Sequence, residues 1–273
     1  MEINSREKTI LDQIVDARRE SIAHRKRVLP EVALKIAVEK AEPPRDFAGA
    51  LTHSEYNIIA ELKKASPSRG IIRPGYVPAD LAPLLERAGA AALSVLTEEE
   101  FFLGSLADLK AARKTTHIPV LRKDFIVDPW QVWEARAAGA DTFLLIAAIL
   151  SDDSLRKLLE LGHALKMEPL VEVHSREELD RVIAAGARII GVNNRDLRDF
   201  RVRLEVSLEL IESIPDSCIA VSESGLHSHD DLVRLRSAGF DAFLIGEFLM
   251  KAADPAEPLR SLLGSGSTGR TEA

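Results

Sequence analysis

The chain has 273 residues, of which 46% are hydrophobic and 29% charged, a composition typical of a globular protein with a sizeable core. Its net charge of −7 argues against a nucleic-acid partner, so an anionic ligand would need a local cluster of cations. The single cysteine, Cys218, excludes an internal disulfide. No apolar run is long enough for a membrane span or a signal peptide, and we expect a cytoplasmic protein.

The first 45 residues precede the repeated part of the chain. They contain an amphipathic run that includes Ile10, Ile14 and Ala17. This run predicts a helical extension, residues 1–45, that packs on one end of the following domain. Residues 265–273 lack a hydrophobic run and are expected to form a disordered tail.

Residues 46–264 alternate between short aliphatic runs and segments with helical spacing, such as Leu155, Leu158 and Leu159. Because parallel strands need a crossover that a helix supplies, this alternation predicts a parallel sheet. Eight strands are expected, at 57–62, 91–96, 119–123, 142–147, 169–173, 189–193, 218–222 and 242–245.

A glycine recurs before every second strand of this series. Gly89, Gly139, Gly186 and Gly239 each follow a helix-like segment, where a left-handed residue turns the chain into the next strand. An open doubly wound sheet would share the alternation, but eight units with this repeat favour closure. We therefore predict an α/β fold, a (β/α)8 TIM barrel with an N-terminal helical extension, whose catalytic domain spans residues 46–264.

Charged side chains recur where the predicted strands end. Active sites of such barrels form at the carboxyl ends of the strands, so these groups are expected to share one mouth. Crowded carboxylates and cations shift each other's pKa values, which suits general acid–base chemistry. The alternative is a set of ion pairs that only fastens the top of the barrel. The group comprises Glu61, Glu172, Glu223, Lys63, Lys123 and Arg195.

Small residues at the last strands and the first loop predict a phosphate site. Ser224 and Gly225 follow strand seven, and Gly246 follows strand eight, where phosphate-binding barrels expose backbone N–H groups. Ser66, in the loop after strand one, adds a hydroxyl on the adjacent side. Each feature alone also fits an ordinary turn.

Seven segments, in this order, resemble the strand-end motifs of the indole-3-glycerol phosphate synthase family: IIAELKKASPSRG, VLRKDFIVDPWQV, FLLIAAIL, PLVEVHS, IGVNNRDL, VSESGL and FLIGEFLM. The resemblance runs from about residue 10 to residue 263. It implies closure of the indole ring of 1-(2-carboxyphenylamino)-1-deoxyribulose 5-phosphate, with release of carbon dioxide and water. That reaction is a carboxy-lyase step of tryptophan biosynthesis, and it implies no metal or organic cofactor.

The resemblance also implies roles for individual residues. Lys123 is the general acid of ring closure, and Glu172 and Lys63 serve the dehydration in an order that stays open. Further residues orient these groups or bind the substrate's hydroxyl and carboxylate: Glu61, Asn193, Arg195 and Glu223. Phosphate contacts are expected at Ser66, Ser224, Gly225 and Gly246. Apolar walls around the anthranilate ring are expected at Phe102, Phe125, Leu144 and Leu197, for which core packing is an almost equal interpretation. Arg195 could instead be only a structural pair for Glu223.

Two positions depart from the family pattern. No aromatic residue precedes Phe47 to cover the ring pocket, and Glu247 follows Gly246 where some relatives have a small polar residue. We expect the Glu247 side chain to point away from the phosphate, because a carboxylate would repel it. His174 is expected to be a solvated loop histidine.

Two other functions remain open at this stage. A phosphoribosylanthranilate isomerase would need a cysteine at the end of strand one, where this chain has Glu61 and Lys63. A non-catalytic phosphate-binding barrel predicts loss of at least one of Lys63, Lys123 and Glu172, and all three are present. The expected partner is a small-molecule substrate, with no nucleic acid and no membrane, and the expected state is a monomer or a weak homo-oligomer.

Overall fold

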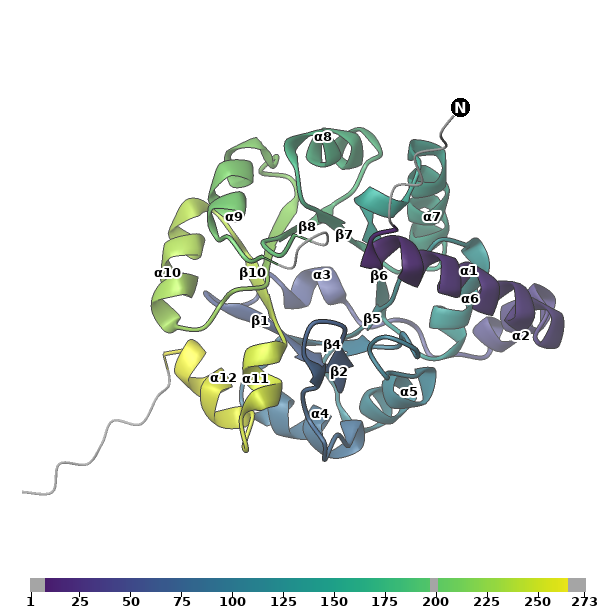
Figure 1. Ribbon diagram of the computed structural model, residues 1–273, viewed down its shortest axis with the longest axis horizontal. Coiled ribbons are helices and arrows are strands. Elements are labelled where there is room, and N and C mark those ends of the chain that lie inside the picture. Colours follow the sequence, from purple (N-terminus) through teal and green to yellow (C-terminus); the bar gives the residue numbers. More distant parts are fainter. Residues whose placement is uncertain (1–7, 197–200, 265–273) are drawn as a thin grey trace, which may run out of the picture.

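The computed structural model describes residues 8–196 and 201–264. Eight parallel strands close into a barrel in the order β1-β10-β9-β8-β7-β6-β5-β4 (Figure 1). The predicted (β/α)8 fold is therefore confirmed, and the predicted strand positions agree within one residue at each end. The strands are β1 (Asn57–Leu62), β4 (Ala92–Leu96), β5 (Val120–Lys123), β6 (Thr142–Ile146), β7 (Leu170–Val173), β8 (Ile189–Asn193), β9 (Ile219–Glu223) and β10 (Ala242–Ile245).

Helices cover the outside of the barrel, and local sequence signals mark their ends. The side chain of Asp128 caps α6, with Pro129 as its first residue, and Ser228 and Asp231 form a capping box at α10. The glycines after α4, α6, α8 and α10 have positive φ, as their spacing predicts. The outer helices are α4 (Pro78–Arg87), α5 (Leu106–Thr115), α6 (Pro129–Ala137), α7 (Asp152–Ala164), α8 (Arg176–Ala184), α9 (Glu205–Leu210), α10 (His229–Ala238) and α12 (Ala256–Leu262).

Short elements complete the connections. An antiparallel pair, β2 (Ala65–Ser66) and β3 (Gly70–Ile71), lies in the loop between β1 and α4 and was not predicted. Helix α11 (Glu247–Lys251) follows β10, and two 3₁₀ turns, η1 (Ala147–Ile149) and η2 (Ile211–Ser213), follow β6 and α9.

Alternation along each strand divides the buried side chains between two cores. In β1, Ile58, Ala60 and Leu62 pack outward against the helices, while Ile59 packs inside the barrel. Glu61 has the parity of Ile59 and therefore belongs to the interior. The same alternation applies in the other strands. Lys123, Glu172 and Glu223 have the parity of interior residues, so their side chains point inward at the carboxyl ends of the strands.

Three helices precede the barrel: α1 (Ile10–Val28), α2 (Glu31–Glu39) and α3 (Phe47–Ala50). In Figure 1, helix α1 runs from near β6 outward past α6 on the right of the view, and its Ile14 joins the apolar cluster inside the barrel. Ile22 of α1 and Leu34 of α2 pack on Trp130 of α6. Within the described residues, no helix is long and apolar enough to cross a membrane.

Candidate active site

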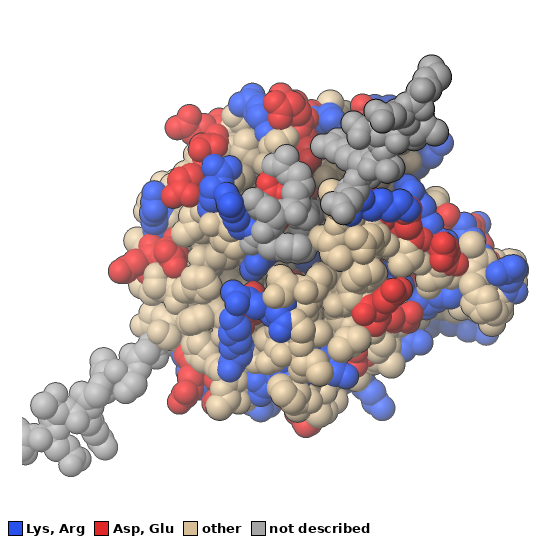
Figure 2. Space-filling view, viewed as in Figure 1, with Lys and Arg blue, Asp and Glu red and all other residues tan. Residues whose placement is uncertain are grey.

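A cavity of about 500 Å³ opens at the carboxyl ends of the strands. Its lining includes every predicted catalytic and binding residue that the structure describes; Leu197 lies outside the described residues. Lys and Arg side chains border the central part of this face (Figure 2). Residues spread over most of the chain therefore meet around one volume, whose size suits a small-molecule ligand.

Lys123, the last residue of β5, lies between two buried carboxylates. Its Nζ is 2.9 Å from Oε2 of Glu172 and 2.7 Å from Oε2 of Glu223. Both carboxylates come from strand positions with inward parity, on β7 and β9. Oε1 of Glu223 has no hydrogen-bond partner among the described residues, although it is buried.

The shared ammonium separates the pKa values of the two carboxylates. Burial opposes ionisation of Glu172, but Lys123 and His174 outweigh it and lower the pKa of Glu172. Burial raises the pKa of Glu223 to about 7. Lys123 opposes this rise by attracting the negative charge, whereas Glu172 and Glu61 add to it by repelling that charge. Burial also opposes the charge of Lys123, yet Glu172 and Glu223 raise the pKa of Lys123 above its ordinary value. The arrangement thus favours a charged ammonium beside an ionised Glu172.

Glu61 and Lys63 form a second ion pair in the cavity, with Nζ of Lys63 2.5 Å from Oε1 of Glu61. Glycine is required beside this pair, because a Cβ on Gly246 would lie 2.3 Å from Oε1 of Glu61. Gly191 leaves similar room for Glu223, whose Oε1 would lie 2.2 Å from an added Cβ. These two glycines let buried carboxylates approach the backbone.

The loop after β9 has an unusual backbone conformation. Ser224 and Gly225 have φ of 68° and 81°, in the left-handed region. The side chain of Asn194 holds this loop, donating to the carbonyls of Glu223 (3.0 Å) and Ser224 (3.1 Å). The buried Oγ of Ser66, which belongs to the lining of the same cavity, has no hydrogen-bond partner among the described residues. Together these groups form a small polar cradle suited to an anion.

The opposite wall is apolar. Phe102 and Phe125 lie with ring centroids 6.0 Å apart, and Leu144 is buried beside them. Phe125 and Leu144 also belong to the core inside the barrel, so the same side chains line the cavity and pack in the core. The carboxylate of Glu98 accepts the backbone N–H of Phe102 at 2.9 Å and so fixes the loop that carries this ring.

Comparisons with known proteins agree with this geometry. The family described as indole-3-glycerol phosphate synthase matches residues 11–262. The chain belongs to this family. An indole-3-glycerol phosphate synthase of Dehalococcoides mccartyi is 48% identical, with 93% of this chain and all of that protein covered. The enzyme of that name from Chloroherpeton thalassium is 49% identical over 89% of this chain and 95% of its own length.

Solved structures support the fold alone. The 3-hexulose-6-phosphate synthase of Salmonella typhimurium has a TM-score of 0.61 at 15% identity, covering 77% of this chain and 99% of its own. A mutant tryptophan synthase α-subunit of Pyrococcus furiosus has a TM-score of 0.59 at 14% identity, covering 76% of this chain and 98% of its own. At such identities the likeness is evidence for the barrel fold alone.

Glu247 corrects one expectation drawn from the indole-3-glycerol phosphate synthase pattern. Its side chain does not point away but helps to line the cavity. Three cations hold its carboxylate: Lys251 at 2.6 Å, Arg69 at 3.2 Å and Arg195 at 3.3 Å. Because these cations offset its charge, Glu247 can lie near an anion site. Arg195 therefore pairs with Glu247. Glu223, which was considered as a partner of Arg195, pairs with Lys123.

His174 is a residue that sequence reasoning misplaced. It is not a solvated loop histidine: its side chain is 15% exposed, and Nε2 lies 3.3 Å from Oε1 of Glu172. Burial lowers the pKa of His174, but Glu178 and Glu172 outweigh burial and raise it. The available signal was alternation, because His174 stands two residues after Glu172 and so faces the same side.

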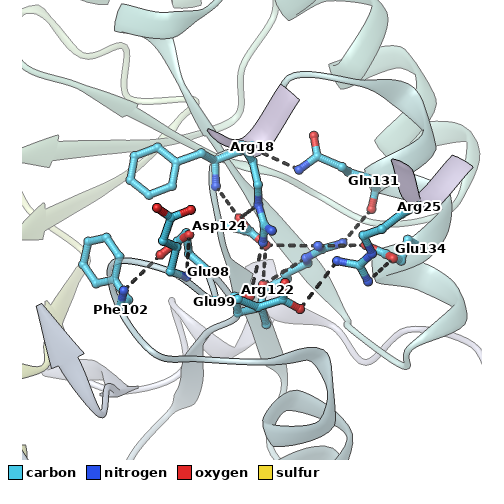
Figure 3. Close-up of polar contacts among 12 residues, drawn as sticks. Arg18, Arg25, Glu98, Glu99, Phe102, Arg122, Asp124, Gln131 and Glu134 are labelled. Carbon is cyan, nitrogen blue, oxygen red and sulfur yellow. Dashed lines mark hydrogen bonds and ion pairs between the residues drawn. The ribbon is translucent and has the colours of Figure 1, made fainter. Parts of the chain in front are cut away.

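Asp124 follows Lys123 and, by alternation, points out of the barrel toward α1 (Figure 3). Its Oδ1 accepts from Nε of Arg18 at 2.8 Å, and its Oδ2 accepts from Thr97 at 2.6 Å and from Nη2 of Arg122 at 3.0 Å. Burial opposes ionisation of Asp124, but Arg122 and Arg18 hold its pKa well below the ordinary value. The N-terminal helix is thus tied to the residue next to the buried ammonium.

The same network continues to α6. Arg122 lies 2.9 Å from Oε2 of Glu134 and donates to the carbonyl of Gln131 at 2.9 Å, and Arg25 of α1 also pairs with Glu134 (Figure 3). Within the described residues, no group of His, Cys, Asp and Glu is placed to hold a metal ion.

Proposed function

We propose that the cavity at the carboxyl ends of the strands binds 1-(2-carboxyphenylamino)-1-deoxyribulose 5-phosphate and converts it to indole-3-glycerol phosphate, a carboxy-lyase step of tryptophan biosynthesis. The observation that carries this proposal is the Lys123 ammonium, held between two buried carboxylates in a cavity with one apolar wall and one polar cradle. Membership of the indole-3-glycerol phosphate synthase family supports the same reaction.

The two sides of the cavity match the two ends of this substrate. The phosphate lies in the cradle of Ser66, Ser224, Gly225 and Gly246, where backbone N–H groups and hydroxyls donate to its oxygens. The anthranilate ring lies against Phe102, Phe125 and Leu144. The reacting ketone is then placed between these ends, near the carboxylates and amines of the strand termini.

Ring closure forms a bond between the aromatic carbon that bears the carboxylate and the ribulose carbonyl carbon. The carbonyl oxygen gains negative charge as this bond forms. The Lys123 ammonium donates its proton to that oxygen, and Glu172 and Glu223 keep the ammonium charged beforehand. The product of this step is an alcohol on a ring that has lost its aromaticity.

Decarboxylation and dehydration complete the reaction. Breaking the bond to the carboxylate releases carbon dioxide and returns the electron pair to the ring, which restores the aromatic benzene. Lys63 then protonates the departing hydroxyl, which leaves as water, and Glu172 accepts a proton from the ring carbon between the nitrogen and the carbon that carried the hydroxyl, so that the new C=C bond forms and the N–H stays. The lowered pKa of Glu172 supports the role of base, because the carboxylate is ionised before the step.

The test is turnover of this substrate by the purified chain in the presence of a chelator, followed by indole absorbance. We expect full activity with chelator and a loss of at least about 100-fold in Lys123→Ala, the lower range for a positioned general acid. Lys64→Ala is the control, because it also removes an ammonium but Lys64, the neighbour of Lys63, does not line the cavity. This variant should retain activity.

Two outcomes would contradict the proposal. Binding of the sugar phosphate without turnover by the parent chain would favour a non-catalytic phosphate-binding barrel. Turnover of phosphoribosylanthranilate alone, with no indole formed from the carboxyphenylamino substrate, would favour the isomerase.

A further inference from the structure

A second cavity lies at the end of the barrel opposite the catalytic mouth. Its volume is about 490 Å³, and its walls are the linker after α2, the last turns of α5 and the end of α6. Helix α5 leads into β5, and Gly139 in the cavity wall stands just before β6. The cavity therefore opens at the amino ends of these strands, and a ligand there would not compete with the substrate.

Basic side chains dominate this cavity. Lys110 and Lys114 are exposed at its rim, and three guanidinium groups lie deeper. The basic lining residues are Arg45, Lys110, Arg113, Lys114 and Arg136, against one acidic lining residue, Glu42. Such a concentration of positive charge is notable in a chain with a net charge of −7.

One buried carboxylate, Asp141, lies beneath the cations. Its Oδ1 accepts the backbone N–H of Arg45 at 2.8 Å, and its Oδ2 accepts that of Val120 at 2.8 Å. Oδ2 is also 3.2 Å from Nε of Arg113. Asp141 thus pairs directly with one guanidinium, that of Arg113, and its remaining contacts are with backbone groups.

The other two guanidiniums are held by neutral carbonyls. Arg45 donates to the carbonyl of Ile118 at 2.7 Å, and Arg136, which is 5% exposed, donates to those of Ala41 and Glu42. In the part of the chain that the structure describes, no carboxylate lies within ion-pair distance of either guanidinium. Carbonyls satisfy hydrogen bonds but carry no net charge, so positive charge remains in excess.

The pKa values of these two arginines agree with that excess. Burial, followed by the positive charge of Arg113, lowers the pKa of Arg45, and Asp141 offsets only part of this. The pKa of Arg136 is lowered for the same two reasons. A bound anion would relieve both effects, since it would supply the missing negative charge.

We propose that this cavity binds a small anion bearing a phosphoryl group, with the half-buried Arg45 and the buried Arg136 as its partners and Lys110 and Lys114 at its exposed rim. A phosphoryl group carries up to two negative charges near neutral pH, and planar guanidiniums bind its oxygens in pairs. The anion would join the linker after α2 to α5 and α6, so binding would also stabilise the folded chain.

The test uses inorganic pyrophosphate as the probe and isothermal titration of the full chain, beside Arg69→Gln, a variant that removes a cation from the catalytic mouth and none from this cavity. We expect the parent chain to show a binding event that Arg69→Gln retains. The double variant Lys110→Gln/Lys114→Gln should weaken that binding at least about tenfold, because two rim charges are lost, while turnover stays unchanged. The matched control, Lys157→Gln/Lys166→Gln, removes two exposed charges elsewhere and should bind as the parent does.

Three results would overturn the proposal. Binding that Arg69→Gln weakens and Lys110→Gln/Lys114→Gln does not would place the phosphoryl site at the catalytic mouth. Equal weakening in both double variants would assign the binding to general surface charge. Malonate binding as tight as pyrophosphate binding would remove the preference for phosphoryl groups. None of these results depends on indole formation, so the catalytic proposal can fail or stand separately.

Discussion

Lys123 shows how one ammonium can give two carboxylates different roles. Glu172 and Glu223 both contact its Nζ, yet the pKa of Glu172 is lowered and that of Glu223 is raised. The difference arises in their other neighbours, because His174 adds positive charge beside Glu172 whereas Glu61 adds negative charge near Glu223. Because their pKa values are separated, Glu223 can hold a proton at a pH at which Glu172 is ionised and can accept one.

The raised pKa of Glu223 predicts a pH-dependent contribution to stability. The carboxyl titrates near 4.5 when unfolded and near 7 when folded, so the folded state binds more protons between these values. The contribution of Glu223 to the free energy of unfolding therefore falls as pH rises through this window. The neutral side chain of Glu223→Gln removes that dependence. Relative to the parent, its melting temperature should rise between about pH 5 and about pH 8.

Thermal unfolding of both chains at the two pH values checks this sign. Glu209→Gln is the matched control, because it changes an exposed carboxylate on α9 and should keep a constant offset from the parent. If the offset of Glu223→Gln is also constant, Glu223 does not titrate in this window and the account of its neighbours is wrong.

Sequence alone could place the residues at the mouth but not pair them. Alternation along each strand puts Glu61, Lys123 and Glu223 on the inner face, and that much follows from the printed order. Which carboxylate contacts which amine depends on the register between strands that are distant in the chain. For this reason Arg195 was considered a partner of Glu223, whereas it pairs with Glu247.

Helix α1 contacts the residue that follows Lys123. Arg18 lies on its buried face, where Ile14, Val15 and Ile22 are also buried. Its guanidinium pairs with Asp124, the residue after Lys123, and so holds the end of β5 from outside the barrel (Figure 3). The amphipathic pattern predicted a helix but not this contact, because an arginine among apolar residues gives no indication of its partner.

We predict that Arg18→Gln lowers both stability and turnover. Removing one partner of a buried ion pair costs about 3–5 kcal/mol, because Asp124 would keep an uncompensated charge. If Arg18 positions Lys123, kcat should fall by up to about 100-fold, the effect of roughly 1 Å of misplacement, with little change in KM. Arg18→Lys should restore part of kcat, since the charge remains.

Steady-state kinetics well below the melting temperature of each variant separates the two effects. Arg19→Gln is the control, because Arg19 is the exposed neighbour on the same helix and its side chain is 62% exposed. A loss of stability with unchanged kcat would mean that Arg18 only fastens α1 to the barrel and does not position Lys123.

At the scale of the whole molecule, the barrel was predictable because its signals are repeated. Eight aliphatic runs, their capping residues and the glycines after α4, α6, α8 and α10 all point to the same fold. The features that were missed occur once each, such as the β2–β3 pair and the cations around Asp141. Such features depend on contacts between distant segments, which no local pattern records.

Charge is distributed unevenly over the molecule, and this has a kinetic consequence. The chain is acidic overall, with a net charge of −7, whereas the lining of the catalytic mouth balances five carboxylates with five cations: Lys63, Lys123, Arg69, Arg195 and Lys251. The proposed substrate carries a phosphate and a carboxylate, so the exposed cations Arg69 and Lys251 attract it while the rest of the surface repels it. Salt screens such attraction, because the Debye length falls from about 10 Å at 0.1 M to about 3 Å at 1 M.

We therefore predict that kcat/KM falls as ionic strength rises from roughly 0.05 M to about 0.5 M, by about tenfold. The value of kcat should change little, because a bound substrate already contacts the buried groups and excludes salt from them. Arg69→Gln removes a cation that is 59% exposed at the mouth and should flatten the dependence. Lys157→Gln, an exposed change on α7, should leave it unaltered. If kcat fell as steeply as kcat/KM, salt would be acting on the chemical step or on the fold, and attraction by the mouth would not explain the rates.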